Sequence, residues 1–427
     1  MPARDVIEIL AIILAAGLVS ELVASALRLP RMVVLLGAGA LLGPHVLDAI
    51  DVPFRSIGVQ LLLTLGVSFI LFHGGLGLAF SVLRPVAVGV GLLAVPGVVL
   101  TAVVTGVVAY LAFDVPLEAG LLIGAVLAPT DPAILIPLFE RLRVRAKVTQ
   151  TIIAESALND VTGAVLALSL APFVIEGEGS LVSPFGEFLV DLAISTGIGA
   201  AFGVALAVAI SNRRIGIWHE SPVIAVLLIV AAGYFTIDYA GGSGYLGAFL
   251  AGVIVSNMDE LGLGMHSHRE VELRRFAAIT ADVMVIFIFV VLGANLPFDT
   301  ISDEAPAAFV TLAALMLVAR PLTVLACLLP NRRGGWERNE IVFLSWTRET
   351  GVVPAALVGL LIAMGVSYED ELITVVALAV IVTLLLQAST KRWLAQRLGL
   401  DEPEPSPIGG GRLARNGKDE GEAAPAR

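Results

Sequence analysis

Residues 116–139 read PLEAGLLIGAVLAPTDPAILIPLF, an apolar run that two prolines and an aspartate interrupt at its centre. A run of this length is about what a helix needs to cross a bilayer. Pro129 and Pro132 each lack a backbone N–H, and a proline inside a helix clashes with the carbonyl one turn back. We therefore expect the helix to break here. The freed carbonyls and the Asp131 carboxylate then lie at membrane depth, where a protein tolerates them only if they are buried or line a cavity.

The rest of the chain shares the apolar character of this run. Of its 427 residues, 57% are hydrophobic and 15% are charged, whereas soluble domains are about a quarter charged. A soluble fold could not cover so much apolar surface. We therefore predict an all-α polytopic membrane protein with about 13 transmembrane helices. The expected segments are 5–27, 31–49, 57–80, 84–113, 116–139, 149–175, 187–211, 218–237, 243–257, 271–296, 304–330, 338–365 and 370–390.

Basic residues mark one side of the expected membrane. If the N-terminus is outside, the inner loops collect most arginines and lysines, ending with Lys391, and the outer loops carry mainly acids. This bias predicts a multi-pass protein of the cell (inner) membrane with a cytoplasmic C-terminus. Residues 399–427 are rich in Pro, Gly and charged groups, so we expect a disordered cytoplasmic tail after a membrane domain of residues 1–398.

Composition also excludes several classes of site and partner. Cys327 is the only cysteine, which rules out a disulfide within the chain and argues against a cysteine-based metal or redox site. The net charge is -11, and no basic patch with interleaved aromatic residues is present. A nucleic-acid partner is therefore not expected.

A second polar cluster lies in segment 149–175. Glu155 and Asn159 are four residues apart, and so are Ser156 and Asp160, so the four side chains form a stripe on neighbouring faces of one helix. Ionisable groups inside a membrane are costly and mark functional sites by default. We expect the stripe to face the broken helix around Asp131, although interhelical hydrogen bonding alone is the alternative.

A third cluster, Thr347 to Pro354, interrupts segment 338–365. Arg348 stays charged at any accessible pH, so we expect it to pair with a buried acid, either Glu155 or Glu349. A structural Glu155–Arg348 ion pair is the prediction. Gly351 and Pro354 are expected to break this helix, as Pro129 and Pro132 break the earlier one.

The two interrupted segments occupy corresponding positions in the chain. One is the fifth of the first six segments and the other is the fifth of the last six. Broken helices at matching positions of two halves are typical of transporters built from inverted repeats, with the site near the midplane. We therefore predict two discontinuous helices that cross, with their terminal dipoles facing the site.

Three further charged or polar groups lie in apolar segments. His73 is deep in segment 57–80, where a packing histidine is favoured over an accessory proton relay. Asp282 and Arg320 either pair with each other or line a vestibule, and sequence does not decide between these arrangements.

Taken together, the motifs resemble those of the monovalent cation/proton antiporter superfamily, in its sodium/proton exchanger branch. The resemblance rests on Pro129-Thr130-Asp131-Pro132, Glu155-Ser156-x-x-Asn159-Asp160 and Arg348. It covers roughly residues 5–390, and the motifs are far more specific together than separately.

The resemblance implies an architecture as well as a site. Members of the family are expected to form homodimers in which a core moves against a dimerisation scaffold. Here the core would comprise roughly residues 84–175 and 304–390, and the scaffold roughly 5–80 and 187–296. By resemblance, Asp160 binds the cation or the proton.

The other site residues take their roles from the same resemblance. Thr130, Asp131 and Ser156 help coordinate the monovalent cation, while Glu155 and Arg348 brace the core. The pair Asn159-Asp160 is similar to the Asn-Asp pair of the electroneutral branch of the family.

The predicted function is secondary active antiport of a monovalent cation, sodium first, for protons, and the chain is not expected to be an enzyme. Burying a bare carboxylate costs too much free energy, so the site should move only with a cation or a proton bound. The opposing gradient supplies the energy, and no nucleotide or metal cofactor is expected. Potassium/proton antiport is the main alternative. A cation channel and an intramembrane aspartyl protease are alternatives from other classes.

Overall fold

The computed structural model describes residues 3–131, 144–177, 182–212, 216–331 and 334–400. Over these ranges the regular elements are helices, and no β-strand occurs among them. In chain order they are α1 (Ala3–Leu27), α2 (Arg31–Leu42), α3 (Ile57–Leu76), α4 (Phe80–Leu83), α5 (Ala87–Ala94), α6 (Pro96–Phe113), α7 (Leu117–Leu127), α9 (Ala146–Glu176), α10 (Val182–Ile210), α11 (Pro222–Tyr239), α12 (Gly244–Ser256), α13 (Ser267–Ala294), α14 (Ile301–Ala314), the π-helical η1 (Leu315–Ala319), α15 (Arg320–Leu328), α16 (Arg338–Trp346), α17 (Val352–Met364), α18 (Glu369–Val382), the π-helical η3 (Thr383–Gln387) and α19 (Ala388–Arg397).

The helices confirm the predicted fold class. Within the described ranges, nine helical stretches are long and apolar enough to cross a membrane, and four shorter apolar helices accompany them. Each of the thirteen predicted segments contains at least one of these helices. The second half of segment 116–139, including Pro132, lies outside the described residues.

Several predicted segments are compound. Segment 84–113 consists of α5 and α6, which meet at Val95 immediately before Pro96. The segment that starts at α14 continues through η1 into α15, and α18 continues through η3 into α19. Pro321, the second residue of α15, cannot donate a backbone hydrogen bond to the turn before it, which suits the wider π turn of η1.

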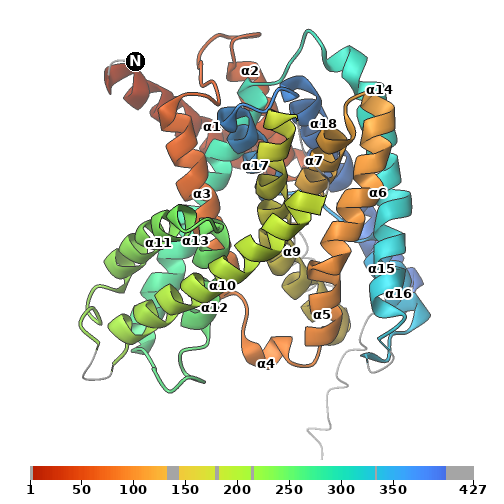
Figure 1. The fold of residues 1–427 in the computed structure, drawn as a ribbon. Coiled ribbons are helices and arrows are strands. Elements are labelled where there is room, and N and C mark those ends of the chain that lie inside the picture. The colour runs from red at the N-terminus through yellow and green to blue at the C-terminus, as the bar shows by residue number, and fades with distance from the viewer. Residues whose placement is uncertain (1–2, 132–143, 178–181, 213–215, 332–333, 401–427) are drawn as a thin grey trace, which may run out of the picture.

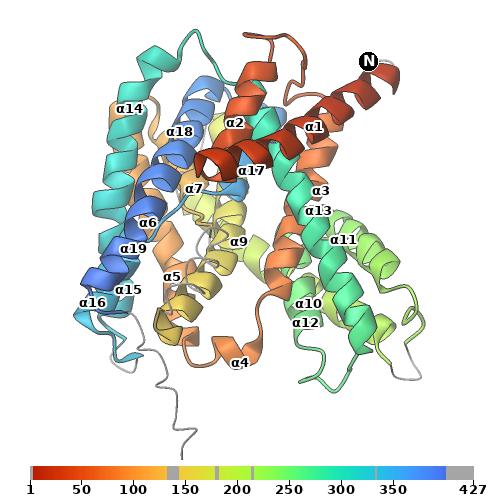
Figure 2. The ribbon, with the colours of Figure 1, turned by 180° about the vertical axis from the view of Figure 1, so that it is seen from behind.

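The helices sort into two groups by their packing. In one group α12 packs against α3 and α10, and α13 packs against α2 and α3. In the other, α6 packs against α7 and α14, and α14 packs against α18. Figure 1 shows α9 near the centre with the first group on one side and α5, α6, α14 and α15 on the other. Figure 2 shows α1 running across the bundle over α2 and α13, which it contacts. The division into a core and a scaffold, and movement between them, stays a prediction.

Backbone contact between α3 and α12 explains one of the glycines. A Cβ at Gly252 would lie 2.1 Å from the carbonyl oxygen of Phe72, so no larger residue fits there without moving a helix. Membrane helices associate through small residues of this kind because lipid provides no hydrophobic drive for association. The close approach fixes α12 against α3 within the first group.

Two breaks in the helices meet beside α9. Helix α7 ends at Leu127, and residues 128–131 are not helical; α16 ends at Trp346, and α17 starts only at Val352. Helices α7, α9 and α17 contact one another. Pro354 is the third residue of α17, where its missing N–H would have no helical partner in any case. Its ring instead prevents the helix from extending back through the break.

The start of the predicted tail needs a correction. Leu400 is fully buried, and its carbonyl accepts a hydrogen bond from the Arg145 N–H at 3.1 Å. Gly399 ends α19 with a positive φ of 63°, a conformation that glycine adopts at low cost. Residues 399 and 400 therefore pack against the start of α9, because Leu400 buries its side chain there. Residues 401–427 lie outside the described part of the chain.

Candidate functional site

The first break is clasped by α9. The Asn159 amide nitrogen donates to the Thr130 hydroxyl at 2.8 Å, and the Thr130 N–H donates to the Asn159 amide oxygen at 3.2 Å. The Ser156 hydroxyl donates to the Thr130 carbonyl. All three residues are buried. The predicted polar stripe therefore faces the predicted break, as expected. Its side chains form hydrogen bonds with backbone groups that a continuous helix would have paired.

Asp131 joins the first break to the second. Its N–H donates to the Glu349 carbonyl at 2.9 Å, and its side chain lies directly against Gly351. A Cβ at Gly351 would lie 2.1 Å from the Asp131 Cβ and 2.2 Å from a carboxylate oxygen, so glycine is required for steric reasons. Gly351 precedes the first residue of α17, and the positive end of a helix dipole stabilises a carboxylate at that position.

Asp160 completes the site from α9. Its carboxylate lies beside the Thr130 backbone and close enough to Asp131 for the two charges to interact. Asp131 and Asp160 are both partly exposed, while Thr130, Ser156 and Asn159 are at most 8% exposed. Two partly exposed carboxylates are therefore surrounded by buried hydroxyl, amide and carbonyl groups. Oxygen atoms of these kinds suit a hard cation.

Pro129 also contacts α9. A Cβ at Gly163 would lie 2.6 Å from a ring carbon of Pro129, so the proline ring packs directly on the α9 backbone one turn beyond Asn159. The proline therefore interrupts α7 and also packs the non-helical residues against α9.

The partner of Arg348 differs from the prediction. Arg348 is 2% exposed, and its Nη2 donates to the carbonyl oxygens of Leu127 at 2.8 Å and Ala128 at 2.7 Å. These carbonyls end α7, where a helix leaves unpaired acceptors and carries partial negative charge. The expected Glu155–Arg348 ion pair is wrong, because a helix C-terminus rather than a carboxylate binds the guanidinium.

Glu155 pairs with Arg320 instead. The two guanidinium Nη atoms of Arg320 each contact one carboxylate oxygen of Glu155, the Nη2–Oε2 distance being 3.0 Å, and both side chains are buried. Arg320 Nε donates to the Leu344 carbonyl at 3.1 Å, in the last turn of α16. Each half-helix that enters a break therefore ends on a buried arginine. The sequence singled out Arg320 as an intramembrane charge and left open whether it pairs with Asp282 or lines a vestibule.

Lys391 is the residue that sequence reasoning missed. It forms an ion pair with Glu349, and the two side chains are 0% and 1% exposed. The predicted last segment ended at residue 390, which placed Lys391 in an inner loop, but the helix continues to Arg397. The signal that could have found it is the polar spacing of Thr383, Gln387 and Lys391, four residues apart on one helical face.

The other polar candidates lie away from these contacts. His73 is exposed in the last turn of α3, close to the charges of Asp282 and Arg274, so it is not the packed histidine that was favoured. Asp282 is mostly exposed and lies 4.0 Å from Arg31. It therefore does not pair with Arg320.

A cavity approaches the site along α9. It has a volume of about 440 Å³ and includes Val165, little more than one turn beyond Asp160. Asp191 and Asp238 also line it, so its walls carry negative charge that attracts cations. Ser169 on α9 donates a hydrogen bond to the Asp191 carboxylate at 2.9 Å, which links α9 to α10.

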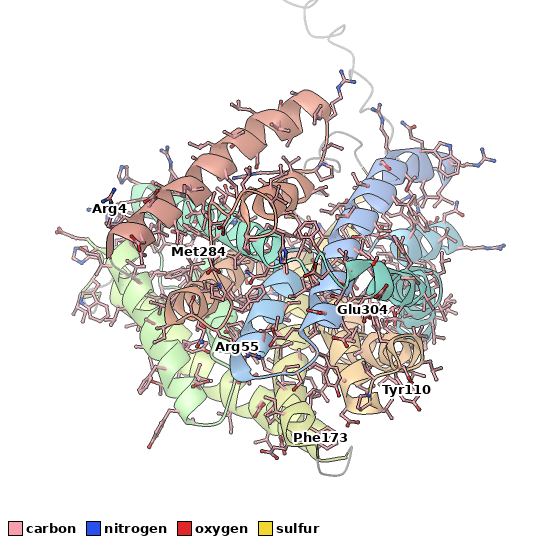
Figure 3. All side chains as sticks on the ribbon, turned by 90° about the horizontal axis from the view of Figure 1, so that it is seen from above. Arg4, Arg55, Tyr110, Phe173, Met284 and Glu304 are labelled. Carbon is pink, nitrogen blue, oxygen red and sulfur yellow. The ribbon has the colours of Figure 1, made fainter. Side chains whose placement is uncertain are left out.

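A second cavity has a volume of about 520 Å³, and Arg55, which Figure 3 labels, is one of its lining residues. Arg55, just before α3, forms an ion pair with Glu369 at the start of α18 on its wall. In Figure 3, Arg55 lies near the centre of the face shown, between Met284 on α13 and Glu304 on α14. The ion pair therefore connects the two helix groups, although it is exposed to solvent.

Broken helices that meet at carboxylates inside a helical membrane bundle define a secondary transporter. The particular family follows from sequence comparison. The family model described as "Sodium/hydrogen exchanger, transmembrane" matches residues 10–397. The chain belongs to this family.

Individual relatives are distant but match most of the chain. A K(+)/H(+) antiporter NhaP of Alkalimonas amylolytica is 27% identical over 403 residues, which are 94% of this chain and 68% of the relative. The Na(+)/H(+) antiporter ApNhaP of Aphanothece halophytica is 25% identical over 358 residues, 82% of this chain and 67% of the relative. The structure of the sodium proton antiporter MjNhaP1 from Methanocaldococcus jannaschii at pH 8 superposes with a TM-score of 0.79 at 22% identity, covering 93% of this chain and all of that one.

Proposed function

We propose that this protein is a secondary active antiporter that exchanges a monovalent cation, sodium first, for protons across the cell membrane. The observation that carries the proposal is the pair of partly exposed carboxylates, Asp131 and Asp160, at the meeting point of two broken helices. Thr130 and Ser156 add oxygen atoms around them. A proton and a cation cannot both occupy Asp160, so binding of one releases the other.

The charges around the two breaks support one-to-one exchange. Among the described side chains there, the buried cations are Arg320, Arg348 and Lys391, and the carboxylates are Asp131, Glu155, Asp160 and Glu349. With every group ionised the cluster therefore carries one net negative charge. One bound proton or one monovalent cation neutralises it, whereas the empty site keeps a charge that is costly inside a membrane. Antiport that moves no net charge follows from this balance.

Movement in the proposal is alternating access. The expected core, which contains α7, α9 and α17, carries the site past the expected scaffold, which contains α3 and α12, and the scaffold forms a homodimer. The basic inner loops support a topology with the N-terminus outside. The acidic cavity beyond Val165 then opens toward the outside and collects cations. The ion gradient supplies the energy, so no nucleotide or metal cofactor enters the proposal.

Potassium is the second candidate cation. A relative that matches 94% of this chain is described as a potassium/proton antiporter, and another is described as a sodium/proton antiporter. Both ions are hard cations that oxygen ligands accept, so the assay must include both.

Purified protein in liposomes tests the proposal directly. Addition of sodium, lithium or potassium on one side should release protons from a preset gradient, as read by a pH-sensitive dye. Lowering the pH should raise the apparent KM for the cation without lowering the maximal rate, since both ligands compete at Asp160. The Asp160→Asn variant is the control, since an amide cannot carry the proton. Cation-independent proton flux in wild type, or single-channel currents in planar bilayers, would contradict antiport.

The stoichiometry needs a separate measurement. With valinomycin and potassium setting the membrane voltage, sodium-driven proton flux should reverse at the same sodium gradient at every voltage. A reversal point that moves with voltage contradicts one-to-one exchange and points to Asp131 as a second carrier.

A further inference from the structure

The last membrane segment presents a polar face to the second break. Helices α18 and α19 form one continuous rod through η3, visible in Figure 2. Along this rod Thr383, Gln387 and Lys391 are each fully buried. A buried polar row of this kind is unusual on a membrane helix and needs partners in the protein.

Two contacts join this face to the break. The Thr383 hydroxyl accepts a hydrogen bond from the Thr350 N–H at 3.0 Å, and Lys391 forms an ion pair with Glu349. On the rod, Thr383 and Lys391 are about two helical turns apart. In the break, their partners Thr350 and Glu349 are consecutive residues. The non-helical stretch 347–351 is therefore held at two successive residues by one rigid element.

The held residues are the ones that position Asp131. The Glu349 carbonyl accepts the Asp131 N–H at 2.9 Å, and Gly351 lies against the Asp131 side chain. Displacement of the 349–351 backbone therefore displaces Asp131 directly. The contacts given above for Thr383 and Lys391 are with Thr350 and Glu349.

We propose that Thr383 and Lys391 are positioning residues for cation binding, which set the affinity for the cation by holding the 349–351 backbone against Asp131. This inference rests on the proposed antiport. A binding site keeps its geometry only if surrounding contacts hold the conformations of its residues. The Thr383–Thr350 and Lys391–Glu349 contacts do this from a helix that contributes no ion ligand to the proposed site. Loss of either contact loosens the site without removing an ion ligand.

The main test removes the ion pair without unbalancing charge. The double variant Glu349→Gln/Lys391→Met keeps the net charge of the cluster and similar side-chain volumes, and such neutral replacements of buried ion pairs are often tolerated. We expect it to fold and to raise the apparent KM for sodium about tenfold, with a much smaller change in maximal rate, as expected when one charged contact of a positioned group is lost. An unchanged KM in the folded variant overturns the proposal.

A single substitution keeps the test decisive if the double variant fails to fold. Thr383→Val conserves volume and removes the acceptor for the Thr350 N–H, together with the bond that the hydroxyl donates to the Ala379 carbonyl within its own helix. It should raise the KM for sodium about threefold to fivefold, the worth of one hydrogen bond. Thr390→Val is the matched control, because the Thr390 hydroxyl accepts from Trp346 Nε1 at 2.9 Å on the same rod but before the break. Equal KM values for the two threonine variants contradict the proposal.

Gln387→Met provides a second control on the polar face itself. The Gln387 amide makes no hydrogen bond to the described residues, so its loss should leave the KM unchanged. A Gln387→Met variant as impaired as Thr383→Val would mean that polarity of the face, rather than the two contacts, matters. Wild-type protein without sodium-coupled proton flux would instead defeat the proposed function, so the two failures are distinguishable.

Discussion

The two helix breaks are built from similar residues but differ in what they expose. In the described part of the first break, residues 128–131, the Asp131 carboxylate is partly exposed, and α9 side chains form hydrogen bonds to Thr130. In the second break, Thr347 to Gly351 are all buried, and Lys391 and Thr383 hold it from outside. The difference shows that two broken helices that meet at one site can have different roles. In the proposed mechanism one break presents an ion ligand, Asp131, and the other is the buried surface against which Asp131 rests.

The largest expected loss of transport follows substitution of the two carboxylates at the first break, Asp160 and Asp131. Asp160→Asn should abolish cation-coupled proton flux while leaving a folded, membrane-inserted protein, because an amide retains the hydrogen-bonding shape but cannot exchange a proton. Asp131→Asn should lose most activity and bind the cation more weakly. Flux in proteoliposomes, with melting in detergent as the check on folding, gives the measurement. Near-normal exchange by Asp160→Asn would rule it out as the carrier.

The next largest effect is expected where the two breaks touch. Gly351→Ala places a Cβ within 2.1 Å of the Asp131 Cβ, so either the break or Asp131 must move. Overpacking of this kind costs about 1–3 kcal/mol, and we expect a rise in the KM for sodium of about tenfold. Gly365→Ala is unsuitable as a control because Gly365 has a φ of 101°; Gly91→Ala, with nothing within 4 Å of the added Cβ, serves instead. Equal sodium affinities in the two alanine variants would show that the contact between the breaks is unimportant.

Stability separates the arginines that end the two half-helices. Arg320→Ala leaves Glu155 buried without its partner, which costs about 3–5 kcal/mol. Arg348→Ala leaves carbonyl groups of α7 unpaired, which costs about 1–3 kcal/mol. The melting temperature of Arg320→Ala in detergent should therefore be lower than that of Arg348→Ala. The reverse order would indicate that Arg348 rather than Arg320 compensates the Glu155 charge.

The smallest effects concern the prolines of the two breaks. Pro129→Ala removes the ring that packs on Gly163 and frees the chain in the unfolded state, so we expect a loss of about 1 kcal/mol. Pro354 lies in the first turn of α17, where its N–H would be unpaired anyway, so Pro354→Ala should change stability by no more than about 0.5 kcal/mol. Detergent melting curves give the comparison. A larger loss at Pro354 would mean that this ring, and not the outside contacts, maintains the second break.

Much of this arrangement follows from local chemistry that sequence reveals. Apolar runs of bilayer length identify the helices, and prolines flanking Asp131 predict a break because a missing N–H acts within one turn of the chain. The i, i+4 spacing of Ser156 and Asp160 places them on one face of α9 for the same local reason. These predictions needed no knowledge of which helices are neighbours.

The choice of partners was decided only by the tertiary structure. Arg348 was expected to find a carboxylate but meets the carbonyl end of α7, while Arg320 takes Glu155 and Lys391 takes Glu349. A buried cation requires compensating negative charge, yet a carboxylate and a helix C-terminus both provide it. Which one lies within reach depends on how helices that are distant in the chain pack together, as for Arg320 and Glu155, which are 165 residues apart. The sequence therefore determines that charges must be compensated inside this membrane protein, and the packing of α7, α9, α16 and α19 determines how.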